Sequence, residues 1–108
     1  MQLIEKTNDL HIDALQLTKT ALVYRAINHP LRQQILQLLH TNLKMIVTDI
    51  YHKLQLEQSV ASQHLAILRR AGFVNTKREG KNIFYSVNYH RLKEVHQNAE
   101  ELLSRKPS

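Results

Sequence analysis

The chain has 108 residues, and its 15 Lys and Arg against 9 Asp and Glu give a formal net charge of +6 at pH 7. This length fits a single domain over residues 1–108, whose small core favours dimerisation, and the charge suits a polyanion such as nucleic acid. The sequence contains no Cys, which excludes disulfides, thiolate metal sites and thiol redox switches. No apolar run approaches the roughly 18 residues of a membrane span, and the start lacks the apolar stretch of a signal peptide, so we expect a cytoplasmic protein.

Two helices are predicted in the first part of the chain. Apolar residues near helical spacing indicate a helix over about residues 8–28, with residues 7–9 as candidate N-caps. The tripeptide Asn28-His29-Pro30 ends it, because proline disfavours helix at the preceding residue and favours the first turn of a new helix. A second helix is predicted over about residues 30–40, with Arg32 on its polar side. Its apolar face comprises Leu31, Ile35, Leu38 and Leu39.

The middle of the chain indicates two helices joined by a tight turn. A short helix is predicted over about residues 47–54, followed by a turn at residues 55–57 and a longer helix over about residues 58–71. Gly72 then suits a left-handed C-cap. The longer helix has one apolar side and an opposite face of small and polar side chains without an acidic residue. This arrangement is typical of a helix-turn-helix, which we place at residues 47–71.

The pattern then changes to that of β-strands. Residues 73–79 are strand-like, residues 80–82 suit a turn, and residues 83–88 are rich in β-branched and aromatic side chains. They predict a β-hairpin with a basic tip, the wing, at residues 73–88. A last helix with an apolar stripe is predicted over residues 89–105. The predicted fold is therefore mainly α with a small β-hairpin, a winged helix-turn-helix of four helices, two strands and a final helix.

The helix over residues 58–71 carries side chains suited to DNA. Its candidate contacts are Gln58, Ser59, Ser62, Gln63, His64 and Arg70. A helix fits the major groove, where the amides of the two glutamines bond bidentately to adenine and the serines reach bases or phosphates. Arg70 lies further along, nearer to a backbone phosphate, and His64 lies beside the apolar side, which favours packing over base contact. The alternative is that this polar face is simply solvated and binds nothing. The basic wing predicted beside it favours DNA binding over that alternative.

The predicted wing adds cations beside this helix. Its candidate contacts are Lys77, Arg78, Lys81 and Asn82. Such a hairpin reaches along the backbone or into the minor groove, where its cations release counterions. Glu79 opposes this attraction, and we expect it to form a salt bridge with a nearby Arg. The polar helix and the basic wing together predict binding to double-stranded DNA.

Four segments carry motifs in a fixed order. Residues 26–36 are AINHPLRQQIL, residues 58–65 are QSVASQHL, and residues 68–74 are LRRAGFV. Residues 78–85, in the predicted wing, are REGKNIFY. In this order and spacing they resemble the opening, the recognition helix and the wing of the ArsR/SmtB family of bacterial winged-helix repressors.

The resemblance implies a homodimeric repressor. In this family the first and last helices, residues 8–28 and 89–105 here, form the dimer interface. A two-fold dimer places its recognition helices about one DNA turn, roughly 34 Å, apart, which implies an imperfect palindrome as the operator. His29 replaces the Asp that usually precedes the proline, which is expected to alter a helix cap and not the DNA contacts.

The metal sites of the family are poorly matched, and we expect neither a metal nor a cofactor. The Cys pair of one site corresponds to Ile46 and Thr48, which provide no thiolate. The other site corresponds to Asn88, His90, Glu101 and Ser104. Only His90 and Glu101 suit a metal, whereas zinc prefers four strong donors. A metal-responsive repressor that uses these two residues across the dimer remains one alternative. The others are an unidentified small-molecule effector, a protein effector, or no inducer at all, and nothing in the sequence selects among them.

Two other functions compete with DNA-binding regulation. A winged-helix interaction module that has lost DNA binding would expose apolar residues on the recognition helix, which is polar here. An enzyme is not expected, because the chain has no Cys nucleophile, no Gly-rich phosphate loop and no paired-carboxylate motif. Ser62 and His64 lie on different helix faces and cannot act as nucleophile and base. We therefore assign no catalytic residue.

Overall fold

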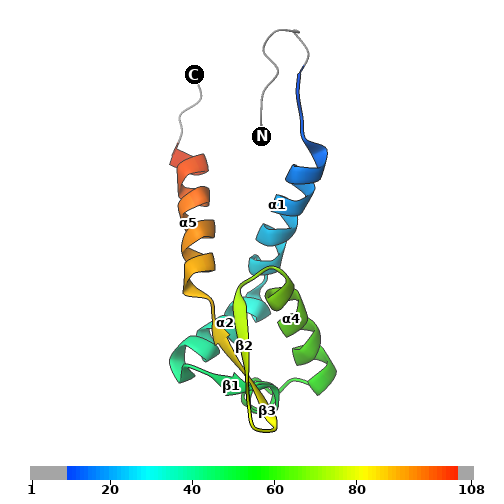
Figure 1. Ribbon diagram of the computed structural model, residues 1–108, viewed down its shortest axis with the longest axis vertical. Coiled ribbons are helices and arrows are strands. Elements are labelled where there is room, and N and C mark those ends of the chain that lie inside the picture. The colour runs from blue at the N-terminus through cyan, green and yellow to red at the C-terminus, as the bar shows by residue number, and fades with distance from the viewer. Residues whose placement is uncertain (1–9, 105–108) are drawn as a thin grey trace.

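The computed structural model describes residues 10–104, which form five helices and a three-stranded antiparallel sheet. In chain order the elements are α1 (Ala14–Ile27), α2 (Pro30–Asn42), β1 (Met45–Ile46), α3 (Val47–Lys53), α4 (Gln58–Arg70), β2 (Val74–Glu79), β3 (Asn82–Val87) and α5 (Tyr89–Ser104). This is the predicted winged helix-turn-helix, with α3 and α4 as the helix-turn-helix and the β2–β3 hairpin as the wing. Figure 1 shows α1 and α5 extending from one end of the molecule and the hairpin tip at the other.

A side-chain cap fixes the beginning of α1. The carboxylate of Asp13 accepts a hydrogen bond from the backbone amide of Gln16 at 3.0 Å, so the helix begins at Ala14. The sequence predicts an earlier start, which is wrong, because residues 10–13 are not helical. The caps expected at residues 7–9 lie outside the described residues.

Two side chains join the beginning of α2 to the end of α1. Nδ1 of His29 accepts a hydrogen bond from the Leu31 amide at 3.2 Å, so an imidazole caps α2. Arg32 is buried, with 7% of its surface exposed, and donates to the carbonyls of Ala26 at 2.6 Å and Arg25 at 3.1 Å. The prediction that Arg32 lies on the polar side of α2 is therefore wrong. Its guanidinium satisfies carbonyls at the end of α1 that have no partner within the helix.

The core lies where α2, α3, α4 and the sheet meet. Its largest fully buried side chains are Ile35, Leu39, Ile50, Leu65, Leu68 and Phe73. Those on α2 and α4 repeat at helical spacing, as the sequence predicts.

A Schellman motif ends α4 and turns the chain into the sheet. The Phe73 amide donates to the Leu68 carbonyl at 2.8 Å, and the Gly72 amide donates to the Arg69 carbonyl at 3.0 Å. Gly72 has a φ of +86°, which a side chain would strain. The prediction of a left-handed C-cap at Gly72 is confirmed.

β3 forms the centre of the sheet, between β1 and β2. In β1, Met45 lies opposite Tyr85 and Ile46 lies opposite Phe84. The sequence does not predict β1, because two residues are too few to show a strand period. At the hairpin tip, Gly80 has a φ of +64° and begins a two-residue loop, as in a type II′ turn.

Large apolar side chains are exposed at the end of the molecule that α1 and α5 form. They are Leu10 and Ile12, which precede α1, Leu15, Leu17 and Leu22 of α1, and Leu102 and Leu103 of α5. Nearer the core, the Tyr24 hydroxyl donates to the Val95 carbonyl at 3.2 Å and accepts from the Asn98 amide at 2.7 Å. Within residues 10–104, no helix has the length and apolarity that crossing a lipid bilayer requires.

Candidate nucleic-acid interface

The outer face of α4 is polar and exposed to solvent. The exposed candidates on it are Gln58, Ser59, Ser62, Gln63 and Arg70. Among residues 10–104, no hydrogen bond or ion pair engages these side chains. The helix has no acidic residue, and its opposite side, which includes Leu65 and Leu68, is buried. Unpaired donors and acceptors on an acid-free helix are what contact with base edges and phosphates requires.

His64 differs from the other candidates on α4 because it is half-buried against α2. Its Nδ1 lies 3.2 Å from Nη1 of Arg32, and its ring centroid lies 4.9 Å from that of His29. A guanidinium only donates, so Nδ1 is the acceptor and the ring is neutral in this contact. Burial, followed by the charges of His29 and Arg32, lowers the pKa of His64 from its ordinary value of 6.5. These contacts favour the packing role, in which His64 holds α4 against α2.

The hairpin presents its cations on both faces. Lys77 lies opposite Phe84 and Arg78 lies opposite Ile83, and neighbouring strand residues point to opposite faces. The side chains of Lys77, Arg78, Lys81 and Asn82 are all exposed. Within the described residues none of them has an ion-pair partner. The wing therefore offers a polyanion three cations that form no ion pair within the described residues.

The one acidic residue of the wing is neutralised from outside the hairpin. The Lys44 ammonium lies 2.6 Å from a Glu79 carboxylate oxygen and 4.7 Å from the centre of the Phe84 ring. The hydrogen bond from Lys44 lowers the pKa of Glu79. The expected salt bridge of Glu79 with an Arg is thus wrong, because the partner is a lysine just before β1. Lys44 offsets the negative charge that opposes DNA and ties the wing to the segment before the edge strand β1.

The two groups of candidates lie toward the same end of the molecule. The chain leaves α4 at the base of the hairpin and runs along β2 to the tip, so the beginning of α4 is the end nearer the tip (Figure 1). The beginning of α4, where Gln58 and Ser59 lie, is therefore toward the same end of the molecule as the hairpin tip. A helix in the major groove with a basic wing beside it requires this geometry.

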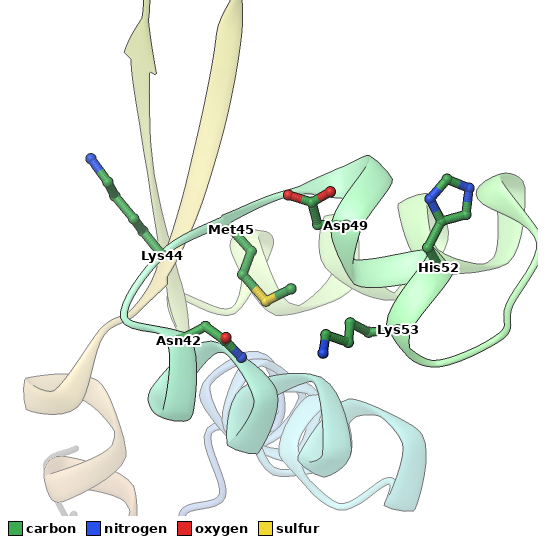
Figure 2. Close-up of a pocket in the computed structure, with 6 residues that line it drawn as sticks. All are labelled: Asn42, Lys44, Met45, Asp49, His52 and Lys53. Atoms are coloured by element: carbon green, nitrogen blue, oxygen red, sulfur yellow. The ribbon is translucent and has the colours of Figure 1, made fainter.

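A hollow of about 460 Å³ lies beside this region, where α2, β1 and α3 meet. Figure 2 shows the side chains around it, with Lys53 extending toward Asn42 and Lys44 pointing away toward the hairpin. Asp49 and His52 of α3 are its only candidate metal ligands. No group of three or more His, Cys, Asp or Glu side chains within residues 10–104 is placed to hold a metal ion.

The positions of the family's last-helix metal site have other surroundings here. Asn88 caps α5, because its side-chain Oδ1 accepts a hydrogen bond from the backbone amide of Arg91 at 3.3 Å. Its side-chain Nδ2 donates to the Gly72 carbonyl at 2.9 Å. His90 and Glu101 are exposed near opposite ends of α5. Asn88 is therefore engaged in joining α5 to the end of α4.

Three comparisons place the chain among known proteins. The sequence profile described as "Bacterial regulatory protein, arsR family" matches residues 29–76, from the cap of α2 into β2. The uncharacterized HTH-type transcriptional regulator MJ1325 of Methanocaldococcus jannaschii is 38% identical over 84 residues, which cover 78% of this chain and 94% of MJ1325. The transcriptional repressor PagR of Bacillus anthracis is 34% identical over 80 residues, which cover 74% of this chain and 80% of PagR.

A solved structure extends this likeness to the fold. Reduced HlyU from Vibrio cholerae matches with a TM-score of 0.62 and 33% identity, over 84% of this chain and 95% of that chain. HlyU is a transcriptional activator by name, whereas PagR is a repressor. Sequence and fold thus lead to one conclusion: the chain belongs to the arsR family of bacterial regulatory proteins and is a DNA-binding transcriptional regulator, not an enzyme.

Proposed function

We propose that the protein is a homodimeric repressor that binds an imperfect palindrome in double-stranded DNA. The recognition helix α4 enters the major groove, where Gln63 and its neighbours read base edges, and the wing contacts the backbone or the minor groove. The observation that carries this proposal is the acid-free polar face of α4, unpaired within the described residues, together with three exposed wing cations that form no ion pair there. Because the partner is chromosomal DNA, the proposal keeps the expected cytoplasmic location.

The exposed leucines of α1 and α5 support the homodimer. Apolar patches of this kind on a small protein mark interaction surfaces, and a second copy offers a matching patch by two-fold symmetry. Two residues of the predicted apolar stripe on α5 are not free to join a dimer interface. Val95 is buried in the protomer's own core, and Leu92 packs against that core. The proposed interface therefore uses α1 and the far end of α5, with Leu102 and Leu103.

Repression is the proposed direction of control. PagR, a relative that the chain matches over most of its length, is a repressor by name and supports this direction. A dimer that covers a promoter blocks access to it without any further contact. The proposal includes no resident metal, and it assigns the release of DNA to an unidentified small molecule or protein.

Selection from a randomised duplex library tests the proposal. We would incubate the purified protein with the library at about 0.15 M salt, where non-specific charge attraction is partly screened. We expect enrichment of a palindrome with half-sites about one helical turn apart, and light scattering that gives the mass of a dimer. A folded dimer that enriches no sequence would contradict the proposal. Placing the enriched site across a promoter in a reporter assay then distinguishes repression from activation.

A further inference from the structure

A groove of about 370 Å³ lies between α4 and β3. It is lined by Ser62, Leu65, Ala66, Arg69 and Arg70 of α4 and by Tyr85 of β3. Leu65 is buried, and Ala66 is too small to fill the space. The polar lining residues are two that carry a hydroxyl, Ser62 and Tyr85, and two arginines. Arg69 and Tyr85 are not among the DNA contacts that the sequence predicts.

The polar groups of this groove have no partners within the described residues. No hydrogen bond or ion pair engages the side chains of Ser62, Arg69 or Arg70, or the hydroxyl of Tyr85, among residues 10–104. Two other tyrosines of the fold differ in this respect. The hydroxyl of Tyr24 bonds to Val95 and Asn98, and that of Tyr89 bonds to His40 at 2.7 Å. The groove thus collects donors that the fold itself does not use.

The charge of the groove selects an anion. Two guanidiniums line it and no carboxylate does. Arginine binds phosphate through a planar fork of N–H donors, and serine and tyrosine hydroxyls donate to phosphate oxygens. A tetrahedral oxyanion therefore fits the donor set better than a neutral ligand or a cation.

The position of the groove indicates the source of that anion. Ser62 lies on α4 beside Gln63, which faces the bases in the proposed complex, so the groove borders the helix that enters the major groove. The DNA backbone runs along the edge of the major groove, and helix-turn-helix proteins contact the backbone phosphates at that edge. Because Arg69 and Arg70 are exposed, a phosphate linked to the chain on both sides reaches them from solvent. The backbone of bound DNA is the occupant that satisfies both the charge and the location.

We propose that Arg69 and Tyr85, together with Ser62, hold one backbone phosphate of bound DNA in the groove between α4 and β3. The inference rests on the proposed function. Tyr85 lies opposite both Met45 of β1 and Thr76 of β2, so it is fixed at the centre of the sheet. A phosphate held between a rigid strand and the recognition helix sets the rotation of α4 in the major groove. Arg69 and Tyr85 therefore position the base-reading side chains without contacting a base.

Neutral phosphate analogues test this contact one position at a time. Each phosphate of the duplex that the wild-type protein enriches would be replaced in turn by a methylphosphonate, which removes the negative charge. Among the phosphates that the protein contacts, we expect one per half-site at which this weakens wild-type binding by about 10-fold and at which the effect depends on Arg69. In Arg69→Gln the same replacement has a clearly smaller effect, because the guanidinium partner of that phosphate is already gone. Tyr85→Phe, which keeps the ring, loses a smaller part of the affinity, about threefold.

Matched controls keep the result specific. Lys93→Gln removes one exposed cation from α5 that does not line the groove, and we expect it to retain the full loss at the sensitive phosphate. Circular dichroism checks that Arg69→Gln and Tyr85→Phe fold as the wild type does. The inference is overturned if both variants keep the wild-type sensitivity at every phosphate. It then fails while the proposed function stands, whereas a wild-type protein that enriches no duplex contradicts the proposed function itself.

Free phosphate tests the other source of the anion. Inorganic phosphate would be added at constant ionic strength while DNA binding is measured. We expect the affinities of the wild-type protein and Arg69→Gln to change by the same factor. A loss confined to the wild-type protein would mean that the groove holds free phosphate as a small ligand, and would overturn its assignment to the DNA backbone.

Discussion

At one end of the molecule, α4 and the hairpin expose amides, hydroxyls and cations, whereas at the other end α1 and α5 expose leucines. The outer face of α4 has no acidic residue and no large apolar side chain, because Leu65 and Leu68 point into the core. On α1, by contrast, Leu15 is 63% exposed and Leu22 is 53% exposed. The polar end is unsuited to burial against another apolar surface, and the apolar end is unsuited to contact with DNA. The polar end fits a hydrated polyanion, and the apolar end fits a second copy of the chain.

This contrast shows how a chain of 108 residues divides its surface between two tasks. The small core leaves several leucines of α1 and α5 exposed, and the proposed dimer would cover them. In the proposed dimer the same interface would set the spacing of the two recognition helices, on which binding to a palindrome depends. The proposal therefore couples the two ends, and it predicts that a change at the apolar end alters DNA binding at the polar end.

The largest expected effect comes from breaking the apolar end. Leu15 and Leu22 lie seven residues apart on one face of α1. We expect Leu15→Asp combined with Leu22→Asp to yield a folded monomer by light scattering. Its affinity for the full palindrome falls by about 100-fold or more, because the two half-sites no longer bind as one.

The matched control for this variant adds the same charge elsewhere on α1. Gln16→Asp combined with Thr20→Asp introduces two carboxylates on a different side of the helix. We expect this protein to remain a dimer with nearly wild-type affinity. If the leucine variant also stays dimeric and binds the palindrome normally, the apolar end is not the interface.

An intermediate effect is expected from pH, through the contact that joins α4 to α2. The pKa of His64 is lowered in the folded protein, so the unfolded chain takes up this proton first as the pH falls. The contribution of neutral His64 to stability is therefore complete above pH 6.5 and is lost as the pH falls through the folded-state pKa. Urea unfolding at a series of pH values measures it. We expect His64→Gln to reduce this dependence on pH, because glutamine does not titrate and still accepts a hydrogen bond from Arg32.

His90→Gln is the control for the loss of an imidazole, since it removes an exposed ring from α5. A pH dependence that is identical in the wild-type protein and His64→Gln would show that the contact between His64 and Arg32 does not govern stability in this range.

The smallest expected effect concerns the salt bridge that ties the wing to Lys44. Glu79→Gln removes the only negative charge of the hairpin and frees the Lys44 ammonium for DNA. We expect the affinity for any duplex to rise by about threefold, with a steeper dependence on salt. Fluorescence anisotropy with a duplex of shuffled sequence measures this. A fall in affinity would mean that the placement of the wing by Lys44 outweighs the removed repulsion.

The helices of the DNA-facing end can be predicted from the sequence because their signals are local. The apolar spacing of Ala61, Leu65 and Leu68 determines which side of α4 is buried, and hence that Ser62 and Gln63 face outward. Gly72 marks the end of that helix through its backbone conformation alone. The wing follows from a change of period and from a turn at Gly80.

The contacts between distant segments cannot be predicted in this way. Arg32 looks like a surface residue by its type, and only the position of the last carbonyls of α1 makes its burial favourable. Glu79 finds Lys44, which is 35 residues earlier in the chain, because β1 pairs with β3. The groove with Arg69 and Tyr85 likewise exists only once α4 and β3 are packed together. Helical and strand periods carry no information on which distant side chains meet.

The division of labour between α4 and the wing is tested most directly by comparing Gln63→Ala with Lys81→Ala. Each protein would be titrated with the selected palindrome and with a shuffled duplex over a series of salt concentrations. We predict that Gln63→Ala lowers the preference for the palindrome by about 1–3 kcal/mol and leaves shuffled-duplex binding unchanged. Lys81→Ala should weaken both complexes equally and reduce the salt slope by about 1 for each wing that contacts DNA. Loss of the preference in Lys81→Ala, with no change in Gln63→Ala, would contradict the assignment of base reading to α4.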